Sequence, residues 1–479
     1  MKNDKILTPD HNSFVLGETS IQKYNNIFIP YILKIIELKE SFMVVDTSGI
    51  ILKNLGEILI KEGYNIVSFD LKNTDNSVTW NPLLVPLREY RKKNYELCIE
   101  QLTNLGTFIM ADVFREGTQD PFWGLSATDL FVGFSLILFK EAKDDSEINI
   151  KSIYKLAETG FSKFSSSTII EKYLRGTDKE LEKIKMIMSS TLSAPIDTRK
   201  SILSVFYQQL KALTNKEKFL NTMCESDFDM ERVCDNKMAL FLSYEDDNVV
   251  SVPIIKSFIN QALFFLTKRR TLFSTERFHF VFNEFLLLGN VSNIIASLIL
   301  SPKYGIDFLV DINSIDILKK IYGLETACFI IDSCKEWVLM SSKDIMAIKK
   351  NNCFIAHIID DGIVKVPAYL EKNEALIAKA SGKLQLIKLN NDLINIGTYE
   401  YSSSKDEKNL VKIFDIKGLV EARSFASMTA KLENIEDFYS YDELKNLSKD
   451  QIDSLIQEID KKISELELQE QMEKIRNNS

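Results

Sequence analysis

The segment from Gly17 to Tyr24 contains residue types that bind phosphate. It follows a short apolar run and has the outline Gly-x-Thr-x-x-x-Lys. A phosphate-binding loop needs glycines whose backbone amides wrap the phosphates, a lysine for the β- and γ-phosphate charge, and a hydroxyl for Mg²⁺. Gly17, Thr19 and Lys23 fit this pattern, but the interior glycines are absent and Tyr24 replaces the metal-binding hydroxyl. On this segment alone, a degenerate nucleotide site and a chance strand-to-helix turn are both open.

A second candidate site follows the apolar run Phe278–Phe282, where the next residues are Asn283 and Glu284. In ATP-driven motors, an aspartate at the first position organises Mg²⁺ and a glutamate at the second polarises the attacking water. Glu284 keeps the carboxylate. Asn283 offers an amide, which binds a metal-bound water without the charge that favours a divalent cation. The alternative interpretation is a strand that simply ends in polar residues.

The cysteines and histidines argue against a metal site. The six cysteines include no Cys-x-x-Cys pair, and no histidine lies at metal-ligand spacing. We therefore expect neither a zinc site nor a disulfide framework, and we infer a reducing compartment. His11, His279 and His357 lie far apart in the sequence, so we expect structural or surface roles for them.

Composition and charge limit the kind of protein. The 479 residues, 45% apolar and 27% charged, are typical of a globular chain of two to four domains. The net charge is −9, of which residues 431–479, with 7 basic and 13 acidic side chains, contribute −6. A nearly neutral body argues against broad nonspecific phosphate binding. We expect no transmembrane segment, because no apolar run reaches about 18 residues, and no secretory signal at the start.

Strand and helix patterns alternate along the first ninety residues. Strands are predicted at Ser13–Leu16, Phe42–Asp46 and Asn65–Asp70. Between them, apolar residues at helical spacing predict helices over Ile27–Leu38 and Leu52–Glu62. This alternation predicts parallel βαβ units and an α/β fold.

A block of helical patterns interrupts this alternation. Strand signals vanish from about Leu84 to Lys218 and return at Met238–Leu242, Phe278–Phe282 and Asp307–Val310. We therefore expect one α/β domain with an all-α insertion. The predicted divisions are 1–83 and 219–400 for the two parts of the α/β domain, 84–218 for the insertion, and 401–479 for a linker and acidic helical tail.

The tail has its own helix signals. Tyr401–Lys408 is rich in serine and charge, as linkers are. Ser448 and Gln451 fit a capping box, in which the glutamine side chain reaches back to the serine amide. The residues that follow show 4-3-4-3 apolar spacing over about two heptads, which predicts an amphipathic helix or a short coiled coil. The apolar positions are Ile452, Ile456, Ile459, Ile463 and Leu466.

Several motifs share their order and spacing with one known family. These are Trp80-Asn81-Pro82-Leu83, Phe122-Trp123, and Asn283-Glu284-Phe285 followed by Leu288-Gly289. They resemble the Trp-Asn-Pro-Leu, Phe-Trp and Asp-Glu-Phe-x-x-Leu-Gly signatures of the type IV coupling proteins, the TraG/TraD class of ring ATPases of conjugation and type IV secretion. The resemblance covers roughly Asn12 to Cys334.

The resemblance implies a RecA-like P-loop NTPase fold, with ATP and Mg²⁺ as cofactors and a hexameric ring. The partners that it implies are the conjugation or type IV secretion machinery and a relaxase or DNA cargo. The site residues that it implies are Gly17, Thr19, Lys23 and Tyr24 around the phosphates, Asp46 beside them, Glu284 and Asn283 at the metal and water, and Asn313 in place of a sensing glutamine.

The departures from the family pattern fall on nucleotide chemistry. The interior loop glycines are gone, Asn283 has lost a charge, and Thr47-Ser48 replaces a Pro-Lys pair, whereas Trp80 and Phe122-Trp123 remain. Residues such as Ile21 at a glycine position resist the backbone geometry that lets amides approach phosphates. We therefore expect binding of ATP and Mg²⁺ to be weak or lost.

Three functional hypotheses follow. The leading one is a coupling-protein-like component with lost or weak ATPase activity that acts by binding partners or DNA. The first alternative is an active, divergent ATPase that pumps single-stranded DNA, and the second is a non-enzymatic assembly scaffold. We expect a cytoplasmic location, with peripheral attachment at the inner face of the membrane as a variant. The residues proposed for DNA phosphates are Arg88, Arg91, Lys268, Arg269 and Arg270.

Overall fold

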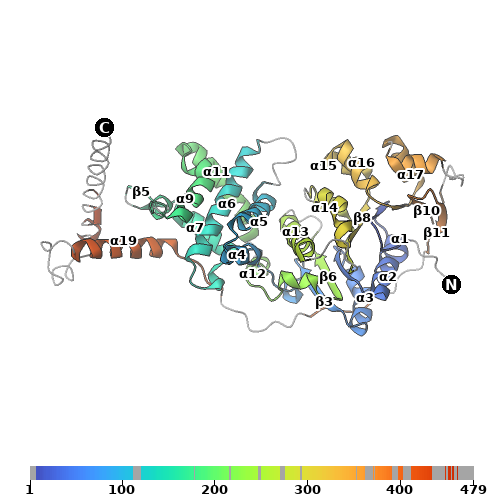
Figure 1. The fold of residues 1–479 in the computed structure, drawn as a ribbon, viewed down its shortest axis with the longest axis horizontal. Helices are drawn as coiled ribbons and strands as arrows, with labels where there is room; N and C mark the ends of the chain where they lie inside the picture. Colours follow the sequence, from blue (N-terminus) through green and yellow to red (C-terminus); the bar gives the residue numbers. More distant parts are fainter. Residues whose placement is uncertain are drawn as a thin grey trace.

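A nine-stranded sheet forms one half of the molecule, and a group of helices forms the other (Figure 1). The structure is a computed structural model. It describes residues 7–111, 120–164, 166–176, 178–214, 217–245, 250–269, 276–291, 294–351, 353–361, 370–371, 373–390, 397–402 and 411–433, together with 448, 451–454, 456–457 and 461.

Seven neighbouring strands of the sheet are parallel, and two antiparallel strands extend one edge, in the order β11-β10-β9-β1-β8-β7-β2-β6-β3. The mostly parallel α/β sheet expected from the alternating pattern is confirmed, but the antiparallel edge was not predicted. The strands are β1 (Ser13–Leu16), β2 (Ser41–Val45), β3 (Asn65–Asp70), β6 (Met238–Ser243), β7 (Phe278–Phe282), β8 (Ile306–Ile312), β9 (Glu336–Leu339), β10 (Glu374–Lys379) and β11 (Leu384–Lys388).

Helices cover both faces of the sheet because successive strand residues point to opposite sides. In β2, Val44 packs with the helices that follow β1 and β2, whereas Met43 and Val45 belong to the core on the other face. The first face carries α1 (Ile21–Lys23), the π-helix η1 (Tyr24–Phe28), α2 (Ile29–Leu38) and α3 (Ile50–Lys61). The second carries α13 (Ser251–Arg269), α14 (Ile294–Leu300), α15 (Ile315–Tyr322), α16 (Leu324–Asp332), α17 (Ser342–Asn351) and α18 (Phe354–Asp361).

In the described part of the predicted insertion, the regular elements are helices and one short hairpin, in which β4 (Lys163–Phe164) pairs with β5 (Ser167–Thr168). Its elements lie together at the end of the molecule away from the sheet (Figure 1). The helices are α4 (Leu84–Arg91), α5 (Tyr95–Gly106), η3 (Thr107–Ala111), α6 (Phe122–Glu141), η5 (Asp145–Glu147), α7 (Ile150–Gly160), α8 (Ile169–Tyr173), α9 (Lys179–Ile187), α10 (Ser189–Leu192), α11 (Ile196–Thr214) and α12 (Glu217–Asn221).

Helix α6 is the central helix of this helical half. Within the described residues it alone has the length and apolar composition of a membrane span, but 78% of its apolar window is buried inside the protein. Phe134 packs edge-on against Phe206 of α11 and against Phe161. The burial identifies α6 as a core helix.

A helix that the sequence analysis did not predict joins the C-terminal region to the helical half. In α19 (Ile416–Glu433), Ile416 and Val420 are buried, and Arg423 pairs with Glu141 of α6 at 2.8 Å. We call residues 411–420 the C-terminal strap. Beyond the strap, α19 extends outward (Figure 1). At the predicted capping box, the Ser448 amide donates to the Gln451 side chain at 2.9 Å; Ile459, Ile463 and Leu466 lie outside the described residues.

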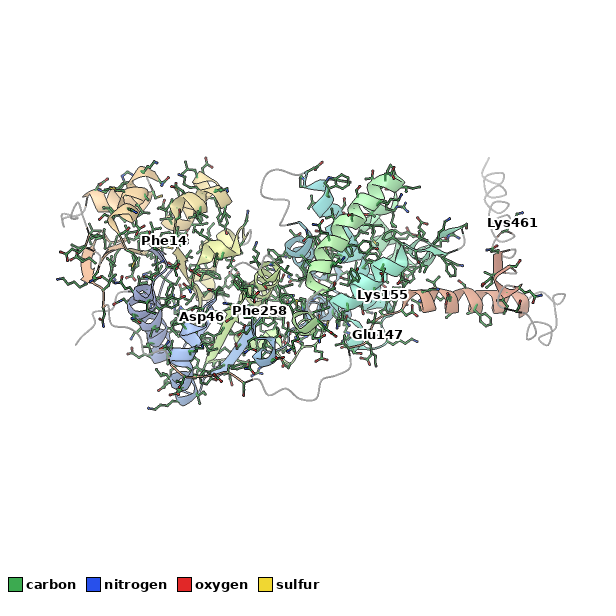
Figure 2. The ribbon with its side chains drawn as sticks, turned by 180° about the vertical axis from the view of Figure 1, so that it is seen from behind. Phe14, Asp46, Glu147, Lys155, Phe258 and Lys461 are labelled. Atoms are coloured by element: carbon green, nitrogen blue, oxygen red, sulfur yellow. The ribbon has the colours of Figure 1, made fainter. Side chains whose placement is uncertain are left out.

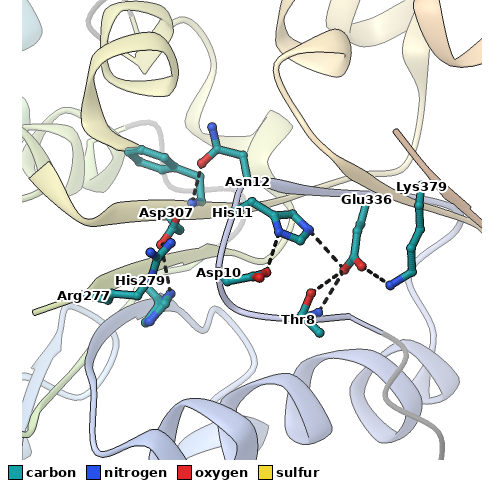
Figure 3. Close-up of polar contacts among 10 residues, drawn as sticks. Thr8, Asp10, His11, Asn12, Arg277, His279, Asp307, Glu336 and Lys379 are labelled. Atoms are coloured by element: carbon teal, nitrogen blue, oxygen red, sulfur yellow. Dashed lines mark hydrogen bonds and ion pairs between the residues drawn. The ribbon is translucent and has the colours of Figure 1, made fainter. Parts of the chain in front are cut away.

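Charged side chains are buried at the amino-terminal ends of the strands (Figure 3). Glu336, at the start of β9, accepts a 2.9 Å hydrogen bond from the Thr8 amide and pairs with Lys379 and His11. His279, at the start of β7, lies 2.7 Å from Glu40. Both histidines therefore pair with carboxylates at this edge of the sheet, and their structural role stays a prediction.

Candidate functional site

The candidate residues meet at the carboxyl ends of the parallel strands, where ligands bind in open α/β sheets. The loop that begins at Gly17 follows β1, Asp46 directly follows β2, and Glu284 is the second residue after β7. Strand β8 lies between β1 and β7. Asp46 lies in the sheet-containing half of the molecule, away from Lys155 in the helical half (Figure 2). Asn313 follows β8 and is exposed.

Lys23 is buried, with 1% of its side chain exposed. Its ammonium group forms a 2.7 Å ion pair with Asp311 near the end of β8, whose side chain is also 1% exposed, and it donates to the carbonyl oxygen of Gly17. Burial raises the pKa of Asp311, and the attraction to Lys23 opposes that rise. The lysine of the Gly17–Tyr24 segment thus binds an internal carboxylate.

Glu284 is held by hydroxyl groups from two other loops. Thr19 donates to one carboxylate oxygen at 2.6 Å, and Thr47 donates to the other at 3.2 Å. The Glu284 amide donates to Asp311 at 3.4 Å. Its φ of 57° is left-handed, a conformation that non-glycine residues adopt only when their surroundings fix it. The bond from Thr19 to Glu284 therefore joins the loops after β1 and β7, across the end of β8.

Asn283 faces a tyrosine. Its side-chain amide donates a 2.7 Å hydrogen bond to the Tyr24 hydroxyl, and both side chains are buried. Burial raises the pKa of Tyr24, while hydrogen bonds with Ser48 and Asn283 lower it. The two residues at the expected metal positions are therefore hydrogen-bonded to each other.

Asp46 caps a helix. Its side chain is fully buried and accepts hydrogen bonds from the amides of Ile51 at 2.9 Å and Leu52 at 3.1 Å, in the first turn of α3. Ser48 donates to the other carboxylate oxygen at 3.0 Å. Burial raises the pKa of Asp46, and these hydrogen bonds offset part of the rise. The carboxylate satisfies amides that have no partner within the helix.

Gly17 is needed for close packing. A Cβ at this position would lie 2.4 Å from Cβ and 2.5 Å from Cγ of Met340, and 3.6 Å from a carboxylate oxygen of Asp344. Burial raises the pKa of Asp344, which also accepts a 2.7 Å hydrogen bond from Ser341. Because glycine has no side chain, the backbone directly after β1 can pack closely against Met340, which follows β9.

These contacts do not fit a Mg²⁺–triphosphate. Lys23 is the cation of the loop, and it is enclosed and paired. The carboxylates of Glu284, Asp311 and Asp344 lie around it and would repel phosphate oxygens. Tyr24 and Asn283 satisfy each other instead of a metal-bound water. The hydrogen bonds at this edge join the ends of the strands to one another.

The proposed DNA-binding residues take part in ion pairs within the chain. Arg88 pairs with Asp229 at 2.8 Å and with Glu231 at 3.4 Å. Arg269 also pairs with Glu231. Lys268 pairs with Glu89 at 3.0 Å, and Arg91 pairs with Asp145. The fold brings Arg88 and Arg269 to one carboxylate, Glu231, whereas Lys268 and Arg91 pair with other carboxylates. Arg270 lies outside the described residues.

Neither Asp311 as the partner of Lys23 nor Thr47 as a partner of Glu284 was identified from the sequence. Asp311 is 288 positions from Lys23, so no local spacing connects them. One signal was present: the apolar segment Ile306–Ile312 contains two aspartates, and a carboxylate in a buried strand needs a partner. Thr47 was noted only as a departure from a Pro-Lys pair.

Comparisons with known proteins identify the family and the fold of this chain. Residues 10–350 match the family model described as type IV secretory system conjugative DNA transfer. No curated protein matches the chain. The solved structures that share the fold include two of conjugative coupling proteins. The bacterial conjugative coupling protein TrwBdeltaN70 with sulphate has 13% identity and a TM-score of 0.57, covering 82% of this chain and 88% of that chain. The plasmid coupling protein TrwB with ADP and Mg²⁺ has 12% identity and a TM-score of 0.55, covering 84% and 89%.

Proposed function

Because this chain belongs to the type IV secretory system conjugative DNA transfer family, we propose that it acts as a coupling-protein-like component that has lost tight binding of ATP. The observation that carries the proposal is the buried pair between Lys23 and Asp311. A phosphate would have to break this pair, and it would leave Asp311 as a buried charge without its partner. That cost is several kcal/mol, about 3–5 for a broken buried pair.

The contacts of Glu284 support the same proposal. Activation of a water requires a carboxylate that is free to accept its proton. Here both carboxylate oxygens accept hydroxyl hydrogen bonds, from Thr19 and Thr47. The protein would then act in DNA transfer through its partners, which we propose are the secretion machinery with a relaxase or DNA cargo.

An active ATPase is the second candidate. The observation in its favour is the shared fold with TrwB, whose structure was solved with ADP and Mg²⁺. Lys23 and Glu284 keep the residue types that such a mechanism needs. In that case the loop would have to rearrange, and Lys23 would leave Asp311 for the nucleotide.

We also propose that the divisions at residues 83, 218 and 400 are domain boundaries, that the chain is located in the cytoplasm or peripherally at the inner membrane face, and that copies can assemble as a hexameric ring.

The third hypothesis, a scaffold without DNA contact, differs from the leading one only in its partners. Retention of labelled single-stranded DNA by the purified chain separates the two.

The deciding experiment is thermal unfolding of the full chain with and without millimolar MgATP. We expect no shift of the wild-type midpoint. A ligand at 100 times its Kd would stabilise the fold by about 2.7 kcal/mol, so tight binding is easily seen. Asp311→Asn releases Lys23 from its charged partner, and Asp316→Asn, on the exposed side of α15, is the matched control.

The outcomes of this experiment distinguish the two candidate functions. A Mg²⁺-dependent stabilisation of the wild type that Lys23→Ala removes would establish the ATPase candidate and overturn our proposal. Stabilisation of Asp311→Asn alone would support the proposal, because it would show that the internal pair blocks the site.

A further inference from the structure

Two cysteines lie side by side in the helical layer on the second face of the sheet. The sulfur atoms of Cys328, in α16, and Cys353, one residue before α18, are 3.1 Å apart. Both are thiols, and all six cysteines of the chain are unbridged. Cys353 is 1% exposed, whereas Cys328 is half-buried.

The contact is held by the helices around it. Asp332, at the end of α16, accepts a 2.9 Å hydrogen bond from the Phe354 amide, which begins α18. The Asn351 carbonyl oxygen accepts a weak hydrogen bond from Cys328 at 3.7 Å. These bonds fix the end of α17 and the start of α18 beside α16. A disulfide has an S–S length of about 2.05 Å, so the two sulfurs need to approach by about 1 Å.

We propose that Cys328 and Cys353 are an oxidation site that forms a reversible disulfide by exchange with a low-molecular-weight disulfide such as oxidised glutathione. This site shares no residue with the strand-end site around Lys23.

The reaction proceeds in two balanced exchanges. The Cys328 thiolate attacks one sulfur of oxidised glutathione, forms a mixed disulfide and releases one glutathione thiolate. The Cys353 thiolate then attacks the Cys328 sulfur of the mixed disulfide, closes the intramolecular bond and releases the second glutathione. The two protons of the cysteine thiols pass through water to the two glutathione thiolates. Overall, two thiols are oxidised and one disulfide is reduced to two thiols.

The order of attack follows from burial. Cys328 is the more accessible thiol, so the oxidant reaches it first. Burial raises the pKa of Cys353, and the neighbouring Cys328 raises it further. Cys353 is therefore a slow nucleophile toward solvent oxidants but is already placed against the sulfur it must attack.

The bond would stiffen the part of the fold that supports the Gly17 loop. It closes a loop of about 25 residues that contains β9, Met340 and all of α17. Met340 and Asp344 of this loop pack against Gly17. Oxidation would therefore restrict motion beside the strand-end site and resist unfolding of the layer.

The test incubates the folded full chain with oxidised glutathione, then denatures and alkylates it, because four of the six cysteines are buried. We expect the count of free thiols to fall from six to four, a Cys328–Cys353 cross-linked peptide by mass spectrometry, and a rise of a few degrees in the unfolding midpoint that dithiothreitol reverses. Cys353→Ser should retain glutathione on Cys328. Cys328→Ser should show neither cross-link nor stabilisation. Cys98→Ser, in the other half of the molecule, should form the same cross-link as wild type, with its thiol count falling from five to three.

A thiol count that stays at six in the folded chain would overturn the proposal. A cross-link that appears only in urea, or one that joins other cysteines, would overturn it as well. If the buried Cys353→Ser variant fails to fold, the wild-type peptide and the half-buried Cys328→Ser variant decide the question.

Discussion

Lys23 and Asp311 form a 2.7 Å ion pair across 288 positions of sequence, with 1% of each side chain exposed. The pair links the first helix after β1 to the end of β8. Ion pairs that are removed from water are stable only where geometry and further hydrogen bonds repay the lost solvation. Here Gly17 and the Glu284 amide provide those further bonds.

The pair makes the two residues interdependent in stability. Lys23→Met or Asp311→Leu alone should lower the free energy of unfolding by about 3–5 kcal/mol, because each leaves a buried charge alone. The double variant should lie close to wild type. Urea unfolding of the four proteins measures the coupling. Lys34→Met, which removes a partly exposed pair with Glu37, should cost less than about 1 kcal/mol. Additive losses in the double variant would show that the two side chains do not interact.

Gly17 should contribute to the stability of the fold through close packing, without any bound ligand. In Gly17→Ala, the new methyl group meets Met340 at 2.4 Å, and such overpacking costs about 1–3 kcal/mol. In a Met340→Gly background, the same substitution should cost much less, because the clashing atoms are gone. Thermal unfolding without nucleotide gives both values. Equal losses in the two backgrounds would contradict the packing explanation.

Glu336 should make stability depend on acid pH. Burial alone raises its pKa, but hydrogen bonds from His11, Lys379 and Thr8 outweigh burial and lower the pKa from 4.5 to about 2 (Figure 3). Because the folded pKa is the lower one, the ionised carboxylate stabilises the fold fully above pH 4.5. That contribution, about 3 kcal/mol, is lost as the pH falls toward 2.

Urea unfolding of wild type and Glu336→Gln at pH 6, 4 and 3 tests this. The difference between the two proteins should be largest at pH 6 and shrink through pH 4 and 3. Glu325→Gln, on the exposed side of α16, is the control and should show a small difference. If the difference in unfolding free energy between wild type and Glu336→Gln does not change with pH, the lowered pKa of Glu336 is contradicted.

The basic residues around Glu231 should contribute little to DNA affinity. Arg88 and Arg269 already pair with Glu231, so Arg88→Ala with Arg269→Ala should leave the salt dependence of single-stranded DNA binding unchanged. If both contacted phosphates, the slope of log K against log salt would fall by about 1.4. A filter-binding titration at several salt concentrations distinguishes these results.

The parallel strands were predictable because their chemistry is local. Buried parallel strands are continuous apolar runs, and Ser13–Leu16, Asn65–Asp70 and Phe278–Phe282 were predicted with the bounds that the structure has. The antiparallel strand β11 was missed: of its five residues only Leu384 is buried, and the other four are half-buried or exposed, so no buried apolar run marks it.

The candidate site could be predicted as a place but not as a set of contacts. Parallel topology brings the loops after β1, β2 and β7 to one edge, so the positions of Lys23, Asp46 and Glu284 followed from the strands. Their partners did not, because Asp311 and Thr47 come from other strands and no spacing relates them to Lys23 or Glu284. Helix α19 was missed for a similar reason: Ile416 and Val420 are buried only because the helical half lies beneath them.

The strand order also determines when the sheet can form during synthesis. Strand β1 pairs with β8 and β9, β2 pairs with β6 and β7, and β3 pairs with β6, so none of the first three strands pairs with another of the three. Until Met238 emerges from the ribosome, the nascent chain can build helices but has no neighbours for its apolar strands. At about 5–20 residues per second, Met238 is synthesised roughly 10 to 50 seconds after Leu16, and throughout this interval β1, β2 and β3 have no strand to pair with.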